Sequence, residues 1–273
     1  MNVDDLDLNI SLWRYMDFSK FVDLVLNEKI YLSPLRKFED IYEGHISNVS
    51  KKKQQQYVQT LSNYLGYSKK TDEIQAIDEK ENDAEKKLVY FAYANCWHSN
   101  KYESAAMWRL YAQTNEAIAI KTTLGNLIKA VKPLKSLRAD GFFCVKKIEY
   151  VDYNDVNSFP EKYNFIQPVS PLCTKRLSFK HENEIRLLYL KSNLLFPPCH
   201  PSEKSKIESM SLKDLENMSS SGVNVDINLR DLIEKIYVAP DAPIWFYEMT
   251  KEFLKKMNLD YIECEKSSLY ELK

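Results

Sequence analysis

The chain has 273 residues, a formal net charge of −1, and 44% hydrophobic and 28% charged residues, proportions that allow a buried core. The near-zero charge argues against a protein that holds nucleic acid mainly by a basic surface, although it leaves a local basic patch open. The five cysteines are scattered without a CxxC pair, which argues against a disulfide scaffold or zinc ribbon and predicts free thiols.

The N-terminal part begins with an aromatic strand at 12–16. A helix is expected at 18–27, because Phe21, Leu24 and Val25 are spaced to form one buried stripe. A second strand is expected at 29–33 and is ended by Pro34. Residues 50–87 are rich in Lys, Gln, Glu, Asp and Asn and predict a polar helical insertion.

The remaining elements alternate irregularly between strand and helix. Strands are predicted at 88–97, 116–121, 142–151, 182–190, 235–239 and 261–264, and helices at 104–112, 124–131 and 244–257. A polar loop insertion is predicted at 193–221. Because several strands have no helix between them, the sequence predicts one α+β domain over 1–273, with a mixed, mostly antiparallel sheet flanked by helices.

Glycine and histidine limit the kinds of ligand site. The five glycines lie far apart, whereas Walker-type and Rossmann-type phosphate loops need clustered glycines. Any bound nucleotide would therefore be held by side chains and strand edges. The histidines lack metal-ligand spacing, so we predict no metal.

The cellular location is predicted from two missing signals. The start of the chain is acidic, without the basic segment and apolar run of a signal peptide. The sequence has no apolar stretch long enough to cross a bilayer. We therefore expect a cytoplasmic protein without membrane contact.

The segment Glu182-Asn183-Glu184-Ile185-Arg186 is the sharpest candidate for chemistry. On a strand, alternation places Glu182, Glu184 and Arg186 on one face. Two neighbouring carboxylates repel, and burial would raise the pKa of one of them. One acid would then bind a ribose hydroxyl while the other stabilises an oxocarbenium ion. The alternative is a solvated strand face with cross-strand ion pairs, which is common on half-exposed strands.

Six ordered stretches resemble a bacterial family, the domain of unknown function 2971. They are Leu12-Trp13-Arg14-Tyr15; Ile30 to Pro34 with Phe38-Glu39-Asp40 and Glu43-Gly44; Cys96-Trp97-His98; Met107 to Ala112; Lys180 with Glu182 to Arg186; and Ile236 to Pro240. Together they span most of the chain and leave the two polar insertions outside. The resemblance implies a family and supplies no reaction.

The order Arg14, Ser33 or Ser99, and Glu182-x-Glu184 is also similar to the arginine–serine–glutamate pattern of ADP-ribosyltransferases. These enzymes hold NAD without a glycine-rich loop. The likeness implies that Arg14 binds the NAD phosphate and that Ser99 braces the site. It also implies that Glu184 is the catalytic acid and that Glu182 orients the nucleophile. Arg14 between aromatic residues is equally typical of a stacked structural arginine.

Two further groups offer a functional and a structural interpretation. Cys96 and His98 would share a strand face and form a nucleophilic pair, or be a core cysteine beside a partly exposed histidine. Trp108 and Tyr111, one helical turn apart, would stack on a base or nicotinamide ring, or pack in the core.

These patterns support two functional hypotheses. The first is an NAD-using ADP-ribosyltransferase-like enzyme of the toxin or antiphage-defence type, acting on a nucleic acid or protein. The second is a non-catalytic sensor or interaction module that binds nucleic acid or a partner protein. The first requires Arg14, Ser99 or Ser33, and Glu184 to converge on one cleft, whereas the second does not.

Overall fold

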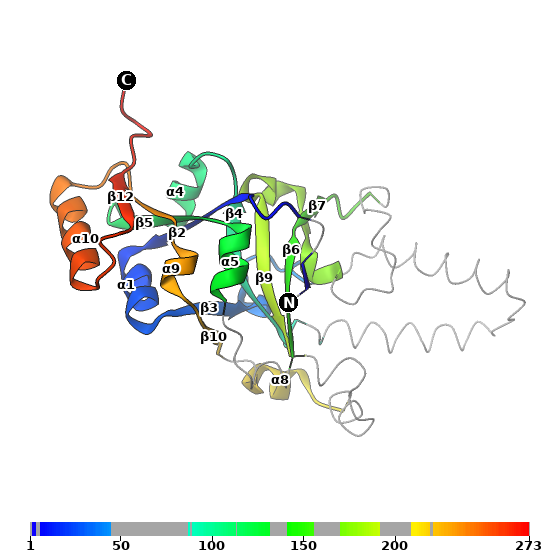
Figure 1. Cartoon of the computed structure of the whole chain (residues 1–273). Helices are drawn as coiled ribbons and strands as arrows, with labels where there is room; N and C mark the ends of the chain where they lie inside the picture. The colour runs from blue at the N-terminus through cyan, green and yellow to red at the C-terminus, as the bar shows by residue number, and fades with distance from the viewer. Residues whose placement is uncertain are drawn as a thin grey trace, which may run out of the picture.

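The computed structural model describes residues 2–3, 6–44, 87, 89–112, 114–131, 141–155, 170–191, 209–218 and 221–272. These residues form a ten-stranded sheet with helices packed on it and a separate two-stranded sheet (Figure 1). Apart from Lys87, the predicted insertion at 50–87 lies outside the described residues.

The strands of the large sheet follow the order β1-β6-β9-β4-β2-β5-β11-β12, with β3 and β10 branching from β4. They are β1 (Asn2–Val3), β2 (Ser11–Asp17), β3 (Lys29–Pro34), β4 (Ala92–Ser99), β5 (Ala117–Thr123), β6 (Phe142–Lys147), β9 (Glu184–Leu190), β10 (Val223–Asp226), β11 (Lys235–Val238) and β12 (Glu263–Lys266). Only the β1–β6 and β11–β12 pairs are parallel among these described strands. The predicted α+β fold with a mixed, mostly antiparallel sheet is confirmed.

Six α-helices and three 3-10 helices surround the sheet in the described ranges. They are α1 (Phe18–Asn27), α4 (Ala105–Tyr111), α5 (Leu124–Ala130), α8 (Leu212–Met218), α9 (Leu229–Leu232) and α10 (Ile244–Lys256), with η1 (Leu35–Lys37), η3 (Ser170–Cys173) and η4 (Leu177–Glu182). The small sheet joins β7 (Glu149–Val151) in parallel to β8 (Thr174–Arg176). Helix α8 lies within the segment that the sequence predicts as a loop, 193–221.

Helix α1 forms where the sequence predicts it, and the three residues of the predicted stripe, Phe21, Leu24 and Val25, are buried. The helix ends at Glu28, whose backbone is left-handed with φ 48°. The chain then returns along β3, which alternates buried and more exposed positions and contacts α1.

A fork opens in the sheet between β2 and β4. Strand β2 pairs with β5 along its whole length, but with β4 only at Leu12 and Trp13. Farther along β4 the partner is β3, at Ser33 opposite Ala94. Backbone groups inside the fork need side-chain partners, because a buried unpaired peptide group is costly. Asn95 fills this role by donating from Nδ2 to the Tyr31 carbonyl at 2.9 Å.

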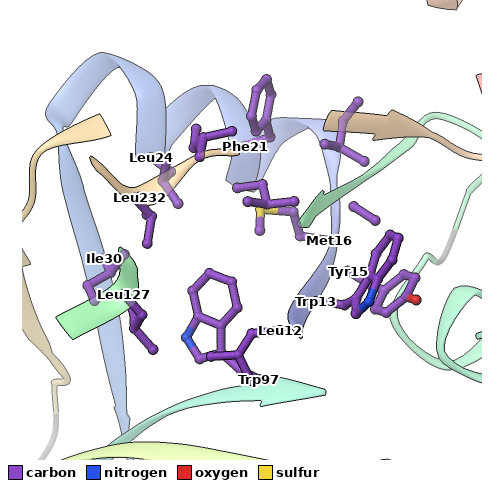
Figure 2. Close-up of a cluster of buried hydrophobic side chains, with 14 of the residues drawn as sticks. Leu12, Trp13, Tyr15, Met16, Phe21, Leu24, Ile30, Trp97, Leu127 and Leu232 are labelled. Atoms are coloured by element: carbon purple, nitrogen blue, oxygen red, sulfur yellow. The ribbon is translucent and has the colours of Figure 1, made fainter. Parts of the chain in front are cut away.

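Strand register divides the sheet into two faces. The helical face carries Trp97, Ile185 and Leu187 beneath α1, α5 and α9, and it forms most of the large apolar core. Figure 2 shows part of this core, where side chains of α1 pack toward those of β2. The polar face carries the row formed by Trp13, His98 and Glu184, which are direct cross-strand partners.

Several predicted strands differ from the structure, and those expected at 88–97 and 261–264 begin only at Ala92 and Glu263. The strand expected at 142–151 is divided at Ile148, whose buried side chain separates β6 from β7. The strand expected to begin at Glu182 begins at Glu184, because Glu182 ends η4 and Asn183 takes a left-handed turn with φ 38°. Asparagine tolerates this backbone better than most residues. In addition, none of the helices in the described ranges is long and apolar enough to span a membrane.

Candidate functional site: a buried ionic cluster beneath α4 and η4

A tight turn carries the first acid into the polar face. The Tyr42 amide donates to Asp40 Oδ1 at 3.1 Å, and the Glu43 amide donates to the Asp40 carbonyl at 2.9 Å. Gly44 follows with φ +73°, and a Cβ there would clash with a methyl carbon of Val89. Only glycine fits this position, so the turn buries Glu43 against the sheet.

Arg186 lies at the centre of the site and is fully buried. Its two Nη atoms donate to both carboxylate oxygens of Glu43 at 2.8 and 2.9 Å. Nε and Nη2 donate to Glu184, and Nη1 also donates to the Leu172 carbonyl at 2.8 Å. Every N–H direction of the guanidinium therefore has an acceptor, as a buried charge requires.

Lys175 adds a second buried cation. Its Nζ lies 2.6 Å from Glu182, 3.3 Å from Glu43 and 3.6 Å from Glu184. We call Glu43, Lys175, Glu182, Glu184 and Arg186 the ionic cluster. Three carboxylates against two cations leave one formal negative charge.

The pKa shifts show how each charge in the cluster is stabilised by its oppositely charged neighbours. Burial opposes the charge on Glu184, but Arg186 and Lys175 outweigh it and lower the pKa of this acid. Burial also opposes the charges on Lys175 and Arg186, yet the neighbouring carboxylates raise both pKa values. For Glu182, burial raises the pKa and Lys175 offsets only part of this shift. Glu184 thus stays ionised, and Glu182 is the acid that protonates more readily.

Two tyrosine hydroxyls lie near the cluster. Tyr150 accepts a hydrogen bond from the Glu184 amide at 2.9 Å. Tyr111 is 43% exposed as a residue, but burial of its hydroxyl, together with the charge of Glu182, raises its pKa. Both groups therefore stay protonated at neutral pH and remain available as donors.

Arg14 lies in the fork between β2 and β4. Its Nη1 donates to the Cys96 carbonyl at 2.8 Å, and its guanidinium lies 5.9 Å from the Trp97 ring centre. Burial lowers its pKa, and the nearby Cys96 and Tyr111 partly offset this shift. Within the described part of the chain, none of the ion pairs of Glu182 and Glu184 involves Arg14. Strand alternation also places Arg14 in the row next to that of Glu184, facing the other side.

The two candidate serines occupy different places. Ser99 ends β4, where its amide donates to the Asn183 carbonyl at 2.8 Å and its carbonyl accepts from the Asn183 side chain. This contact joins the end of β4 to the start of β9. Ser33 lies on β3 opposite Ala94, beyond the fork. The structure therefore brings Ser99, and not Ser33, to the turn between Glu182 and Glu184.

Cys96 and His98 share the polar face, as predicted, because they face Arg186 and Glu184 across the β4–β9 pair. Burial raises the pKa of Cys96 well above its usual value, so this side chain is a thiol at neutral pH and a poor nucleophile. His98 Nδ1 lies 2.6 Å from the Glu182 carbonyl, which can only accept, so Nδ1 carries the proton. His98 is 5% exposed, and burial lowers its pKa. The sequence-based alternative of a partly exposed histidine is thus not what the structure has.

The two aromatic residues of α4, Trp108 and Tyr111, lie in different environments. Trp108 is 3% exposed, stacks edge-on against Tyr15 at 4.9 Å and donates from Nε1 to Glu103 at 3.0 Å. It is a core residue. Tyr111 presents its ring to solvent and is the member of the pair that a ligand can reach.

Two of the five residues of the ionic cluster were not singled out from the sequence. Glu43 and Lys175 lie outside the segments that were assigned chemistry, as do Asp40 and Arg176, which form a neighbouring pair at 2.8 Å. Asp40 and Glu43 belong to a stretch that carries the family resemblance, which was the available signal. Lys175 lies outside the predicted elements and gave no signal of its own.

The elements around the ionic cluster carry exposed basic and aromatic side chains, of which Tyr111 is the one within the field of Glu182. Helix α4 presents Arg109 and Tyr111, the preceding loop presents Lys101 and Tyr102, and η4 presents Lys180 and His181. The Ser99–Asn183 contact joins the loop to η4, and the charge of Glu182 reaches the Tyr111 hydroxyl. We call these six residues the α4–η4 surface. In the described ranges, neither the Arg109 nor the Lys180 side chain forms an ion pair.

Comparisons with protein-family models, with curated proteins and with solved structures give no match. The resemblance to the domain of unknown function 2971 therefore stays a prediction. Within the described residues, no group of three or more His, Cys, Asp or Glu side chains is placed to hold a metal ion.

Proposed function

We propose that this protein is a non-catalytic module that binds single-stranded nucleic acid on its α4–η4 surface. The observation that carries the proposal is a set of exposed aromatic residues and of cationic side chains without an ion pair in the described ranges, carried by the elements around a buried ionic cluster. Cations bind phosphates, and aromatic faces stack on unpaired bases regardless of sequence.

The buried acids support a structural rather than a catalytic role. Glu184 is 3% exposed, and both of its oxygens accept hydrogen bonds from Arg186. A catalytic acid must reach its substrate, and here that would require breaking a buried ion pair. In this proposal the ionic cluster fixes the turn at Glu43, η4 and β9 in place beneath the binding surface.

The exposed residues have complementary tasks. Tyr111 and Tyr102 offer ring faces for bases, and Lys101 lies 5.5 Å from the Tyr102 ring centre, where it can contact an adjacent phosphate. Arg109 and Lys180 carry charges that no acid among the described residues neutralises. A local patch of this kind is compatible with a chain whose net charge is −1.

Fluorescence anisotropy with a labelled 20-nucleotide single strand tests this proposal. We expect saturable binding that weakens with salt. Replacing Arg109 and Lys180 together by alanine should weaken binding by about tenfold or more and reduce the salt slope by about one per removed cation. The matched control removes two exposed lysines from α10, Lys255→Ala and Lys256→Ala, and should leave binding nearly unchanged.

The outcomes separate the candidate partners. Equal loss in both double variants would indicate non-specific attraction and overturn the assigned surface. Tighter binding of a duplex than of a single strand would also contradict it, since stacking needs unpaired bases. Absence of any nucleic-acid binding would leave the partner-protein form of the module hypothesis in its place.

One observation favours the NAD-dependent enzyme as a second candidate. The Ser99 amide donates to the Asn183 carbonyl at 2.8 Å, so the serine of the arginine–serine–glutamate pattern lies beside the turn between Glu182 and Glu184. Incubation with labelled NAD and nucleic-acid or protein acceptors tests this candidate. Turnover by the wild type that is lost in folded Glu184→Gln would establish the enzyme and overturn the non-catalytic module.

A further inference from the structure

A cleft far from the ionic cluster opens between α1, α9 and α10, which lie together in Figure 1. Its volume is about 370 Å³, in the range of small-molecule sites. Val25, Leu229 and Leu259 form an apolar floor and are buried. The rim is polar and carries Glu28 and Asn258. We call this the α1–α10 cleft.

Glu28 occupies a position that local stability does not favour. It is the C-cap of α1 and has left-handed φ and ψ of 48° and 44°, where glycine is the usual residue. Its carboxylate also lies at the helix end that carries partial negative charge, and the last turn of α1 has no basic residue to compensate. Backbone strain and charge repulsion thus coincide at one residue, a combination that points to a function.

The Glu28 carboxylate is available for a ligand. In the described part of the chain it takes part in no ion pair, whereas its neighbour Lys29 pairs with Asp226 at 3.8 Å. The backbone carbonyl of Glu28 accepts from the Ile227 amide at 2.9 Å, which fixes the residue in its strained conformation. A second helix end lies at the same cleft, because α10 ends at Met257 and Asn258 follows with φ 54°. Unlike α1, the last turn of α10 carries the basic residues Lys255 and Lys256, so the uncompensated helix end is that of α1.

The aromatic side of the rim already holds a cation. The Arg230 guanidinium lies 4.9 Å from the Tyr261 ring centre. Burial raises the pKa of the Tyr261 hydroxyl, Arg230 lowers it and the nearby Glu28 charge raises it further, so this ring lies within the field of Glu28. Arg230 already occupies the Tyr261 ring, so the groups left for a ligand are the Glu28 carboxylate and the α1 C-terminus beside the apolar floor, which are complementary to an ammonium group on an apolar body.

We propose that the α1–α10 cleft binds a small primary amine, with its protonated nitrogen on Glu28 and its apolar body on Val25, Leu229 and Leu259. The site uses residues that have no part in the α4–η4 surface. Its occupancy is therefore independent of nucleic-acid binding.

The test is a titration of the full chain, followed by ¹⁵N–¹H NMR, with 2-phenylethylammonium as the probe. Phenylacetate and 2-phenylethanol are the anionic and neutral analogues of similar shape. We expect saturable shifts of the Glu28, Arg230 and Asn258 amides with the ammonium probe, and binding at least about tenfold weaker for both analogues.

Two exposed acids provide the matched variants. Glu28→Gln should weaken the ammonium probe by about tenfold while leaving the protein at least as stable, whereas Glu248→Gln on α10 should change neither. If Glu28 had only a structural role, Glu28→Gln would not weaken probe binding while leaving the stability unchanged. Absence of saturable shifts up to about 10 mM probe, equal binding of the analogues, or full binding by Glu28→Gln would each overturn the proposal.

Discussion

At the start of β9 the two faces are equally buried but carry opposite kinds of side chain, and farther along the strand Leu188 and Leu190 continue the Glu184 face as part of a second apolar cluster. On the helical face, Ile185 and Leu187 pack into the large apolar core. On the polar face, Glu184 and Arg186 are equally inaccessible and belong to a closed ionic network. Filled volume stabilises the first pair of residues, and attraction between opposite charges stabilises the second. Charged residues that alternate with apolar ones along a strand therefore do not indicate that the charged face is exposed to solvent.

The largest loss of stability is expected when the central cation of the ionic cluster is removed. Arg186→Met leaves Glu43 and Glu184 buried without their main cation, and should lower the free energy of unfolding by about 3–5 kcal/mol. Urea denaturation measures this loss. The control is Arg109→Met, an exposed arginine without an ion pair in the described structure, which should cost less than about 0.5 kcal/mol. A loss below about 1 kcal/mol for Arg186→Met would contradict a structural role for the cluster.

A volume change on the helical face gives the second effect. Leu187→Ala removes buried methyl groups and leaves a cavity, so it should cost about 3 kcal/mol by the same urea measurement. The conservative change Ile185→Val at the adjacent core position should cost only about 1 kcal/mol. Equal losses for the two variants would show that the stability contributed by the helical face does not depend on the buried volume that is removed.

The pH dependence distinguishes the two faces further. Because Arg186 lowers the folded-state pKa of Glu184, this acid stabilises the fold above its ordinary pKa of 4.5, and this contribution is lost as the pH falls through the lowered value. The stability difference between wild type and Arg186→Met should therefore shrink as the pH is lowered from 5 toward 2.5. The difference for Leu187→Ala should stay nearly constant over the same range. Parallel profiles for the two variants would contradict the charge-match account.

The smallest effect is expected at the edge of the helical face. Glu28→Gly relieves a left-handed glutamate at the end of α1 and should raise the free energy of unfolding by about 1 kcal/mol. Asn258→Gly, also at positive φ, should gain only a few tenths of a kcal/mol, since asparagine tolerates this backbone well. A thermal melt resolves both, and destabilisation by Glu28→Gly would remove the strain on which the amine site depends.

The sequence predicts local elements well where a periodic pattern is present. The stripe of Phe21, Leu24 and Val25 predicts α1 with its observed ends, and the mixed sheet follows from the order of elements. The helix α9 and strand β10 were missed because such short elements carry too few residues for a period. Their conformation depends on pairing with β3 and packing against α5.

The candidate site was only partly predictable. Glu182, Glu184 and Arg186 stand together in the sequence, and their mutual proximity follows from local geometry alone. Their partners Glu43 and Lys175 arrive from distant segments, and only the tertiary fold brings them within 4 Å. Arg14 likewise donates to the carbonyl of Cys96, which is distant in the sequence, so this contact could not be predicted from residue spacing.

The most direct test of the account is a double-mutant cycle on Glu184 and Arg186, with each residue changed to Met singly and then together, followed by urea unfolding. If the pair is a structural ion pair inside a closed network, the double variant should lose less than the sum of the single losses by at least about 2 kcal/mol. Additivity within about 0.5 kcal/mol would show that Glu184 is not committed to Arg186, and would return this acid to the list of catalytic candidates.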